Sequence, residues 1–292
     1  MPLSGGVALE KRILSLKKKL GLIAGNGIFP LLLAEQAKAK SYTVYAIAIK
    51  EETSPDIEKY VDKCKWINVG QLKKAILFFV WNRVKNLVMA GKVMKTHIYN
   101  DTPMDSAFKD VFKKSTDRKD DSLLKGVVDK VESFGFHFMD STFFLKDQMA
   151  SSGAMTLLSP SEEEFVDINF GLEMAKAISG LDIGQTVVVK DKAVIAVEAI
   201  EGTSAAIERA AGLAGEGIVV VKVSKPLQDM RFDVPVVGED TLLLLKKYGA
   251  KVLAVEAGKT LLLNKEMLIA KANELELVLY GIENRSNRGT GA

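Results

Sequence analysis

Residues 20–30 read Leu-Gly-Leu-Ile-Ala-Gly-Asn-Gly-Ile-Phe-Pro, and this stretch decides the fold class. The apolar residues 20–24 predict a short buried strand, Gly25-Asn26-Gly27 predicts a turn, and residues 29–38 predict a helix. Pro30 fits the first turn of that helix, where its missing N–H costs nothing. A strand, a glycine turn and a helix in this order are typical of α/β domains that bind phosphate groups through backbone N–H groups.

The glycine turn is only half of a dinucleotide-binding fingerprint. Pro30 stands where the third glycine of G-x-G-x-x-G belongs, and no clear acidic residue ends the next predicted strand, residues 43–49. A nicotinamide site is therefore disfavoured. A nucleotide or phosphate contact at Gly25, Asn26 and Gly27 and a plain tight turn both stay open.

Strands and helices continue to alternate up to residue 145. Predicted strands at 66–69, 86–93 and 135–139 and helices at 71–84 and 122–134 indicate a Rossmann-like parallel sheet, residues 18–145. Lys92 follows the end of a strand, where open α/β sheets bind ligands, although an exposed loop lysine explains it as well. Asp120 and Asp121 are expected to cap the helix at 122, and the pair can also hold a divalent ion, so Asp121 is a candidate metal ligand.

Residues 146–161 lose this periodicity and are the expected linker to a second domain, residues 162–282. That domain is expected to be a mixed α/β domain, with a hairpin that turns at Asp191-Lys192. Residues 1–17 can form a membrane-surface helix, but a frayed extension is the preferred interpretation. Residues 283–292 are expected to be a disordered tail.

The chemistry is expected in residues 225–238, Lys-Pro-Leu-Gln-Asp-Met-Arg-Phe-Asp-Val-Pro-Val-Val-Gly, which follow an apolar strand. If residues 231–233 are extended, Arg231 and Asp233 share one face. A cation beside a carboxylate suits phosphate chemistry, with Lys225 as a second cation and Gln228 to orient water or phosphate. The alternative is a surface loop with an ordinary ion pair.

Two other strand ends of the second half also carry polar groups. Glu198, Glu201, Gly202 and Thr203 follow one strand, with Thr203 a plausible N-cap, and Glu256 and Lys259 follow another. If these strand ends lie on one edge of a sheet, their side chains converge on one site.

Composition limits the chemistry. The chain has 292 residues, a net charge of +3, one cysteine (Cys64) and two histidines (His97 and His137). A disulfide, a thiolate metal cluster, a zinc site and a histidine triad are all disfavoured, and a metal would be a hard ion on carboxylate oxygens. The spread of basic residues does not indicate nucleic-acid binding. No apolar run approaches the ~20 residues of a membrane span, and no signal peptide is expected.

Six blocks resemble the bacterial UDP-2,3-diacylglucosamine pyrophosphatases of lipid A biosynthesis, the family unrelated to calcineurin-like metallophosphoesterases. The similarity covers roughly residues 18–281, and Lys119 departs from it where a glycine is expected. The matching blocks are residues 20–27 with Pro30, 120–124, 181–185, 196–203, 225–238 and 254–263.

The resemblance implies two α/β domains with a ligand cleft between them. It implies hydrolysis of UDP-2,3-diacylglucosamine to 2,3-diacylglucosamine 1-phosphate (lipid X) and UMP with Mg²⁺, and it matches Asp233 to the essential aspartate of the family. Asp233, Glu201 and Glu198 can supply hard oxygen ligands to that metal. The implied enzyme is cytoplasmic and peripheral to the inner membrane of a Gram-negative bacterium, and a homodimer is left open.

Two rival interpretations remain. One is a non-catalytic nucleotide- or lipid-binding α/β protein, which would tolerate Asp233→Asn. The other is a Rossmann-type oxidoreductase, against which the missing third glycine argues.

Overall fold

The computed structural model describes residues 18–93, 104–114, 120–226 and 228–283, without the side chains of Lys114, Asp120 and Asp121. The chain forms two compact units. Unit 1 is Met1–Phe144 with Met230–Asp233, and unit 2 is Leu145–Asp229 with Val234–Ala292. The predicted extension at residues 1–17 and the tail from residue 284 lie outside the described residues.

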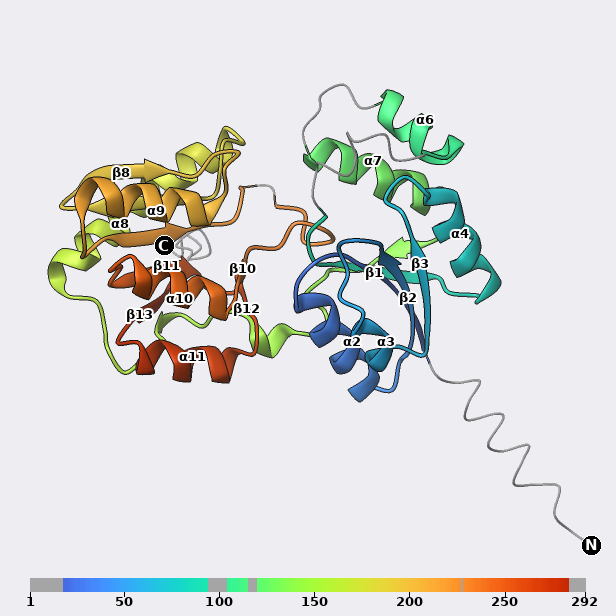
Figure 1. Cartoon of the computed structure of the whole chain (residues 1–292), viewed down its shortest axis with the longest axis horizontal. Coiled ribbons are helices and arrows are strands. Elements are labelled where there is room, and N and C mark those ends of the chain that lie inside the picture. The colour runs from blue at the N-terminus through green and yellow to red at the C-terminus, as the bar shows by residue number, and fades with distance from the viewer. Residues whose placement is uncertain (1–17, 94–103, 115–119, 227, 284–292) are drawn as a thin grey trace, which may run out of the picture. The chain divides into compact units, whose positions relative to one another are not determined.

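Unit 1 contains a parallel sheet of five strands in the order β3-β2-β1-β4-β5 (Figure 1). The expected Rossmann-like sheet is thereby confirmed. Its strands are β1 (Lys19–Ala24), β2 (Thr43–Ile49), β3 (Lys63–Ile67), β4 (Asn86–Ala90) and β5 (His137–Phe138).

Helices cover both faces of this sheet (Figure 1). On one face, Phe79, Val111 and Val128 of three helices share a core with the strands. On the other face, the helix after the glycine turn contacts β1, β2 and β4. The first face is covered by α4 (Leu72–Trp81), α6 (Ser106–Lys114) and α7 (Asp120–Glu132), and α2 (Phe29–Ala39) and α3 (Ile57–Tyr60) complete the helices described in this unit.

Some boundaries of unit 1 differ from the predictions. Strand β3 begins at Lys63, before the apolar residues that predicted it. Helices α3 and α6 were not expected, because α3 has only four residues and α6 is rich in charge. Asp120 and Asp121 lie inside the first turn of α7 and do not precede it, which corrects the expected cap.

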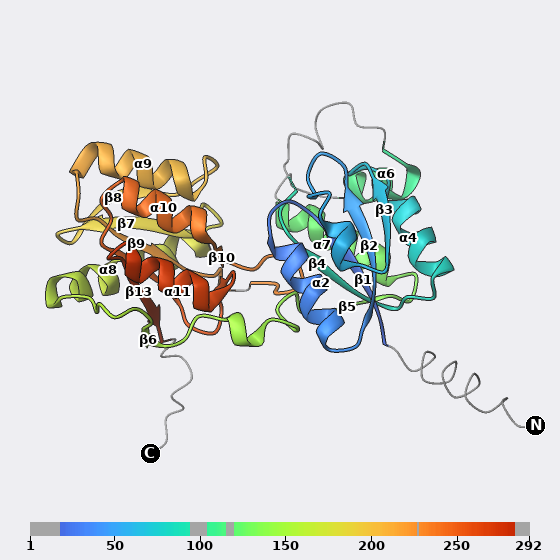
Figure 2. The same cartoon turned by 60° about the horizontal axis from the view of Figure 1, so that its bottom comes forward.

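Unit 2 contains a mixed sheet of six strands in the order β6-β13-β11-β9-β7-β8, and a parallel pair, β10-β12 (Figure 2). The expected mixed α/β architecture is confirmed. The strands are β6 (Gly153–Ala154), β7 (Thr186–Lys190), β8 (Ala193–Val197), β9 (Val219–Lys222), β10 (Val236–Val237), β11 (Val252–Glu256), β12 (Leu261–Leu262) and β13 (Val278–Ile282).

Side chains of β9 alternate between two cores, as the pleat of a strand requires. Val219 and Val221 pack with the residues of one long helix, whereas Val220 packs with three helices on the opposite face. The long helix is α8 (Glu162–Gly180), and the three are α9 (Thr203–Ala214), α10 (Glu239–Lys247) and α11 (Lys265–Glu274).

Local signals explain helix α8 and the hairpin that follows it in unit 2. Ser161 and Glu164 form a capping box at the start of α8. Asp191 and Lys192 adopt φ values of +51° and +60° in the hairpin turn, and the Asp167 carboxylate accepts a hydrogen bond from each of their N–H groups.

Residues 146–161 belong to this unit and are not a free connection. They contribute the 3-10 helix Lys146–Gln148 and strand β6, which pairs antiparallel with β13. Among the described helices, none has both the length and the apolar composition that a membrane span requires.

Candidate functional site

Three polar strand ends of unit 2 lie on one edge of its sheet. Strands β9 and β11 are parallel, and β8 runs the same way because β7 is antiparallel to both β8 and β9. The register places Lys222 opposite Thr186 and Val255, and Val197 opposite Val187. The three strand ends therefore lie on one edge of the sheet, which was the condition for their side chains to converge.

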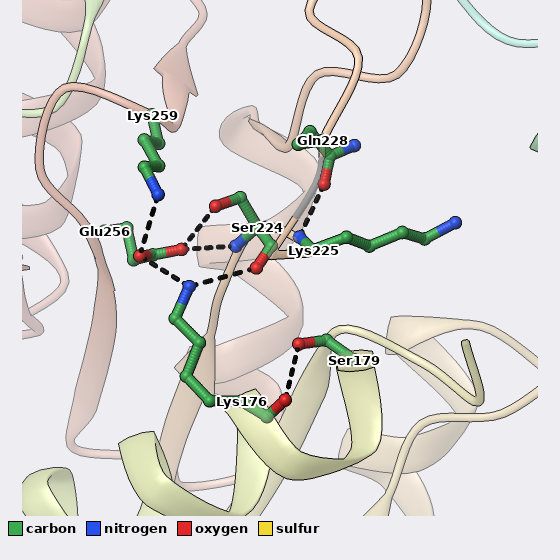
Figure 3. A network of polar contacts seen from close by, with 7 residues as sticks. All are labelled: Lys176, Ser179, Ser224, Lys225, Gln228, Glu256 and Lys259. Carbon is green, nitrogen blue, oxygen red and sulfur yellow. Dashed lines mark hydrogen bonds and ion pairs between the residues drawn. The ribbon is translucent and has the colours of Figure 1, made fainter. Parts of the chain in front are cut away.

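Glu256 is the most enclosed carboxylate of this edge, with 1% of its surface exposed. One oxygen accepts hydrogen bonds from the backbone N–H and the hydroxyl of Ser224, both 2.6 Å long. The other lies 2.7 Å from Lys176 Nζ and 3.7 Å from Lys259 Nζ (Figure 3). Burial raises the pKa of Glu256, but the bonds from Lys176 and Ser224 outweigh it and hold the pKa below its usual value.

This arrangement changes the expected role of Glu256. Both of its oxygens are occupied by groups of the chain, so its carboxylate anchors Ser224 and does not face a ligand. Lys176 also donates to the Ser224 carbonyl at 3.1 Å, while Lys259 is 36% exposed at its side chain. Two cations around one carboxylate leave a net positive charge, which favours binding of an anion.

The loop after Ser224 begins with a closed turn. The N–H of Lys225 donates to Gln228 Oε1 at 2.6 Å, and the N–H of Gln228 donates to the Lys225 carbonyl at 3.2 Å (Figure 3). The ammonium of Lys225 lies 2.8 Å from an Asp182 carboxylate oxygen. Gln228 therefore shapes the loop, and Lys225 is held in an ion pair.

Glu198 is the second carboxylate of this edge. It accepts a hydrogen bond from the Thr203 hydroxyl at 2.8 Å, and Lys222 donates to the same hydroxyl at 2.8 Å. Burial raises the pKa of Glu198, but the Lys222 charge and the bonds from Thr203 and the Gln185 N–H hold the pKa below its usual value.

Thr203 is not an N-cap, in contrast to the expectation. Gly202 occupies the N-cap position of α9 with φ +85°, and no side chain caps the helix. The Thr203 hydroxyl instead donates to Glu198, and its oxygen accepts from Lys222. Glu201 lies 3.0 Å from Arg209 in an ion pair.

The proposed metal ligands do not gather in the described residues. Among these residues, no group of three or more His, Cys, Asp and Glu side chains could hold a metal ion. Glu198 and Glu201 face cations instead. The side chain of Asp121 lies outside the described residues, as does Lys119.

Arg231 and Asp233 belong to unit 1, although most of their neighbours in sequence belong to unit 2. Residues 230–232 form a turn, so the extended conformation that would place Arg231 and Asp233 on one face is not present. The turn is favoured because Phe232 packs against the core of unit 1. The Arg231 guanidinium lies 3.3 Å from Glu132 of α7, and Asp233 is partly buried.

The glycine turn of unit 1 uses its N–H groups within the chain. Gly25 donates to the Ala90 carbonyl at 2.8 Å, and Asn26 donates to the Lys92 carbonyl at 2.6 Å. A Cβ at Gly25 would lie 2.4 Å from the Lys92 oxygen, so this glycine permits the close approach of two backbones. The N–H groups of Gly25 and Asn26 are therefore not presented to a phosphate, and the Lys92 side chain is exposed.

Sequence reasoning missed several residues of these networks. Lys176 is the only basic residue of α8, and such an isolated charge among apolar neighbours was the available signal. Lys222 ends an apolar strand and Ser224 lies two residues beyond it, which is the same signal that identified Glu198 and Glu256.

Comparisons with known proteins cover nearly all of the described chain. Residues 19–148 match the model of the LpxI N-terminal domain, and residues 151–280 match the model of the LpxI C-terminal domain. The UDP-2,3-diacylglucosamine pyrophosphatase LpxI of Caulobacter vibrioides is 30% identical over 277 residues, which are 91% of this chain and 98% of that protein.

Solved structures are more distant. The biotin carboxylase domain of Hydrogenobacter thermophilus 2-oxoglutarate carboxylase is 14% identical, with a TM-score of 0.27 over 60% of this chain and 35% of that chain. An L-amino acid ligase from Bacillus licheniformis is 11% identical, with a TM-score of 0.27 over 63% of this chain and 40% of that chain.

Proposed function

The chain belongs to the LpxI family, and on that premise we propose that it hydrolyses the pyrophosphate bond of UDP-2,3-diacylglucosamine in lipid A biosynthesis. The products are 2,3-diacylglucosamine 1-phosphate (lipid X) and UMP. The observation that carries this proposal is the match to both LpxI domains, together with a pyrophosphatase relative aligned over 98% of its length.

Asp233 is the proposed catalytic residue. Its carboxylate orients the attacking water and accepts a proton from it, while the water oxygen bonds to the sugar-side phosphorus and the bond from that phosphorus to UMP breaks. This role is supported by the partial burial of Asp233 and by its position directly after the turn of residues 230–232 in unit 1, which contains Arg231.

Cations of the chain are proposed to neutralise the phosphate oxygens. Arg231 is paired with Glu132 and Lys225 with Asp182, and each can exchange its carboxylate for a phosphate oxygen. The surplus positive charge of Lys176 and Lys259 around Glu256 supports anion binding at the edge of the unit 2 sheet. Such preorganised charges stabilise a phosphoryl-transfer transition state.

Magnesium is proposed to bind together with the substrate and not as a resident ion of the protein. The described carboxylates do not fit a resident ion, because none forms a group of three and those of the unit 2 edge face cations. Mg²⁺ in phosphoryl-transfer sites takes most of its ligands from phosphate oxygens and water. The ion would supply charge neutralisation when it is bound.

We further propose that the enzyme works at the cytoplasmic face of the inner membrane, because its substrate carries two acyl chains. Helix α4 supports this proposal with an exposed apolar stripe of Leu77, Val80 and Trp81, which are 41%, 50% and 74% exposed. A tryptophan beside aliphatic residues with cations around them is typical of helices that lie in an anionic membrane surface. The exposed cations next to the stripe are Lys73, Lys74, Arg83 and Lys85.

Hydrolysis in ¹⁸O-labelled water tests the function. The protein is incubated with UDP-2,3-diacylglucosamine and magnesium, and both products are weighed by mass spectrometry. Label in lipid X is expected and would support the reaction and attack at the sugar-side phosphorus. Label in UMP would support the reaction but would show that water attacks the other phosphorus. Absence of hydrolysis by folded protein would favour a non-catalytic binding protein.

A further inference from the structure

Ser141 is a buried serine of unit 1 that holds the segment Met230–Asp233. Only 1% of its surface is exposed. Its N–H donates to the Met230 carbonyl at 2.9 Å, and its hydroxyl oxygen lies 2.7 Å from the Arg231 carbonyl. These two carbonyls belong to residues just before Asp233, so Ser141 restrains the backbone that carries the proposed catalytic carboxylate.

The sheet of unit 1 fixes Ser141 in turn. Its hydroxyl also lies 2.6 Å from the carbonyl of Met89 in β4, so its single proton is shared between two carbonyl oxygens. The N–H of Met139 donates to the Leu87 carbonyl at 2.8 Å, which extends the pairing with β4. Ser141 therefore links the Arg231 backbone to a central strand.

The turn that contains Ser141 is itself rigid. One carboxylate oxygen of Asp140 accepts hydrogen bonds from the N–H and the hydroxyl of Thr142, at 2.7 Å and 2.6 Å. The N–H of Phe143 donates to the Asp140 carbonyl at 3.0 Å, and Thr142 is completely buried. These hydrogen bonds on both sides of Ser141 hold its backbone and side chain in one position.

Two further contacts of Met230–Asp233 act on its side chains. The Arg231–Glu132 ion pair is 3.3 Å long between side chains that are 28% and 29% exposed. Phe232 packs against the core through a partly buried ring, which fixes a side chain rather than a carbonyl. Ser141, in contrast, contacts the backbone carbonyls of Met230 and Arg231 from a buried position.

We propose that Ser141 is a positioning residue for Asp233: it sets the location of the catalytic carboxylate without touching the substrate. This inference rests on the proposed function of Asp233. A displacement of about 1 Å at a reacting group can lower turnover about 10²-fold, so loss of the Ser141 hydroxyl should lower kcat and leave KM nearly unchanged.

The test compares kcat and KM of wild type, Ser141→Ala, Asp233→Asn and the double variant. Ser141→Ala is expected to lower kcat about 10- to 100-fold with KM changed less than about threefold. In the Asp233→Asn background, Ser141→Ala should lower the residual turnover no further, because both changes act through one group. Thr53→Val is the matched control: it removes another buried hydroxyl of unit 1, 2.6 Å from the Ala24 carbonyl, and should keep kcat.

Ser141→Cys provides a second variant in case Ser141→Ala does not fold. Its thiol occupies the place of the hydroxyl but is a weaker donor to the carbonyls of Met89 and Arg231. A fall of about 3- to 10-fold in kcat is expected. If Ser141→Ala is unfolded and Ser141→Cys has the kcat of wild type, the inference is overturned.

The remaining outcomes separate this inference from the proposed function. Wild-type kcat in folded Ser141→Ala, or an equal loss in both backgrounds, overturns the positioning role alone. Full turnover in Asp233→Asn removes the premise that Asp233 is catalytic and the inference with it. Absence of hydrolysis by wild type overturns the proposed function itself.

Discussion

Glu256 accepts two hydrogen bonds from Ser224, one from its backbone N–H and one from its hydroxyl, and both are 2.6 Å long. Ser224 is completely buried and is the last residue before the loop at 225–238. A buried carboxylate is costly unless it is paired and hydrogen-bonded, and Lys176 at 2.7 Å supplies the countercharge. The start of this loop therefore depends on an ion pair with α8.

Lys176→Met should destabilise unit 2, because it leaves Glu256 buried with only the more distant Lys259. We expect the free energy of unfolding to fall by about 2–3 kcal/mol. The measurement is urea unfolding followed by far-UV circular dichroism, since both tryptophans, Trp66 and Trp81, belong to unit 1.

Lys246→Met is the control for this prediction. Lys246 pairs with Glu276 at 3.7 Å, and their side chains are 50% and 80% exposed. Such a surface pair contributes about 0–1 kcal/mol. Equal losses in the two variants would contradict the structural importance of the Lys176–Glu256 pair.

Stability should depend on pH through Glu256 and Glu198. Their folded-state pKa values lie below the usual value of about 4.3, so the unfolded chain binds more protons in this range and stability rises with pH. The contribution is complete above the unfolded pKa and is lost as the pH falls through the folded pKa. The gap in unfolding free energy between wild type and Glu256→Gln should therefore narrow from pH 7 to pH 3, and a constant gap would count against this assignment.

Asp233→Asn should lower kcat by at least about 10²-fold while substrate binding persists, because the amide cannot accept the proton of the attacking water. Steady-state kinetics and a binding assay with UDP-2,3-diacylglucosamine measure the two effects. Asp229→Asn is the control, a carboxylate of the same loop that is assigned to unit 2 and has no proposed catalytic role. Near wild-type turnover in Asp233→Asn would remove the role assigned to Asp233.

The architecture of both units could be predicted from the sequence because its signals are local. The apolar residues of β1, the turn residues Asp191 and Lys192, and the capping box at Ser161 each act within a few neighbours. Glu198 and Glu256 could also be identified, because each is a polar residue at the end of an apolar strand. The strands run in the same direction, so both residues lie at one edge of the sheet.

The partners of these residues could not be predicted, because they depend on tertiary contacts. Lys225 is 43 positions from its partner Asp182, and Arg231 is 99 positions from Glu132. Nothing in the sequence around Arg231 indicates that Met230–Asp233 packs in unit 1. The alternation of Arg231 and Asp233 considered there required an extended segment, whereas residues 230–232 form a turn and Phe232 packs against the core of unit 1.

Gly25→Ala and Gly27→Ala should differ, because only one of these glycines is needed for a close approach. A Cβ at Gly25 would lie 2.4 Å from the Lys92 oxygen and 2.9 Å from its carbonyl carbon, both backbone atoms that cannot move easily. Gly27 has φ +96° but nothing within 4 Å of its Cβ position. Thermal unfolding should show a loss of more than about 2 kcal/mol for Gly25→Ala and about 1–2 kcal/mol for Gly27→Ala. The reverse order would contradict the pairing of Asn26 with Lys92.

The α4 stripe should bind anionic membranes. Substituting Leu77 and Trp81 together by serine removes exposed apolar area that no described core cluster uses. We expect the fraction of protein that floats with phosphatidylglycerol-containing vesicles to fall at least about 10-fold, with kcat on detergent-dispersed substrate unchanged. Wild-type binding should weaken with added salt and with purely phosphatidylcholine vesicles, because the neighbouring cations contribute.

A matched double variant, Leu213→Ser with Met267→Ser, tests whether the effect belongs to this stripe. These residues are 71% and 72% exposed on helices α9 and α11 of unit 2, so the same kind of area is removed elsewhere. The control should bind vesicles like wild type. The competing explanation is a homodimer formed through α4, and light scattering of each variant tests it by measuring the molar mass in solution. If the α4 variant changes the molar mass in solution and leaves vesicle binding intact, the stripe is an interface between two copies of the chain and not a membrane surface.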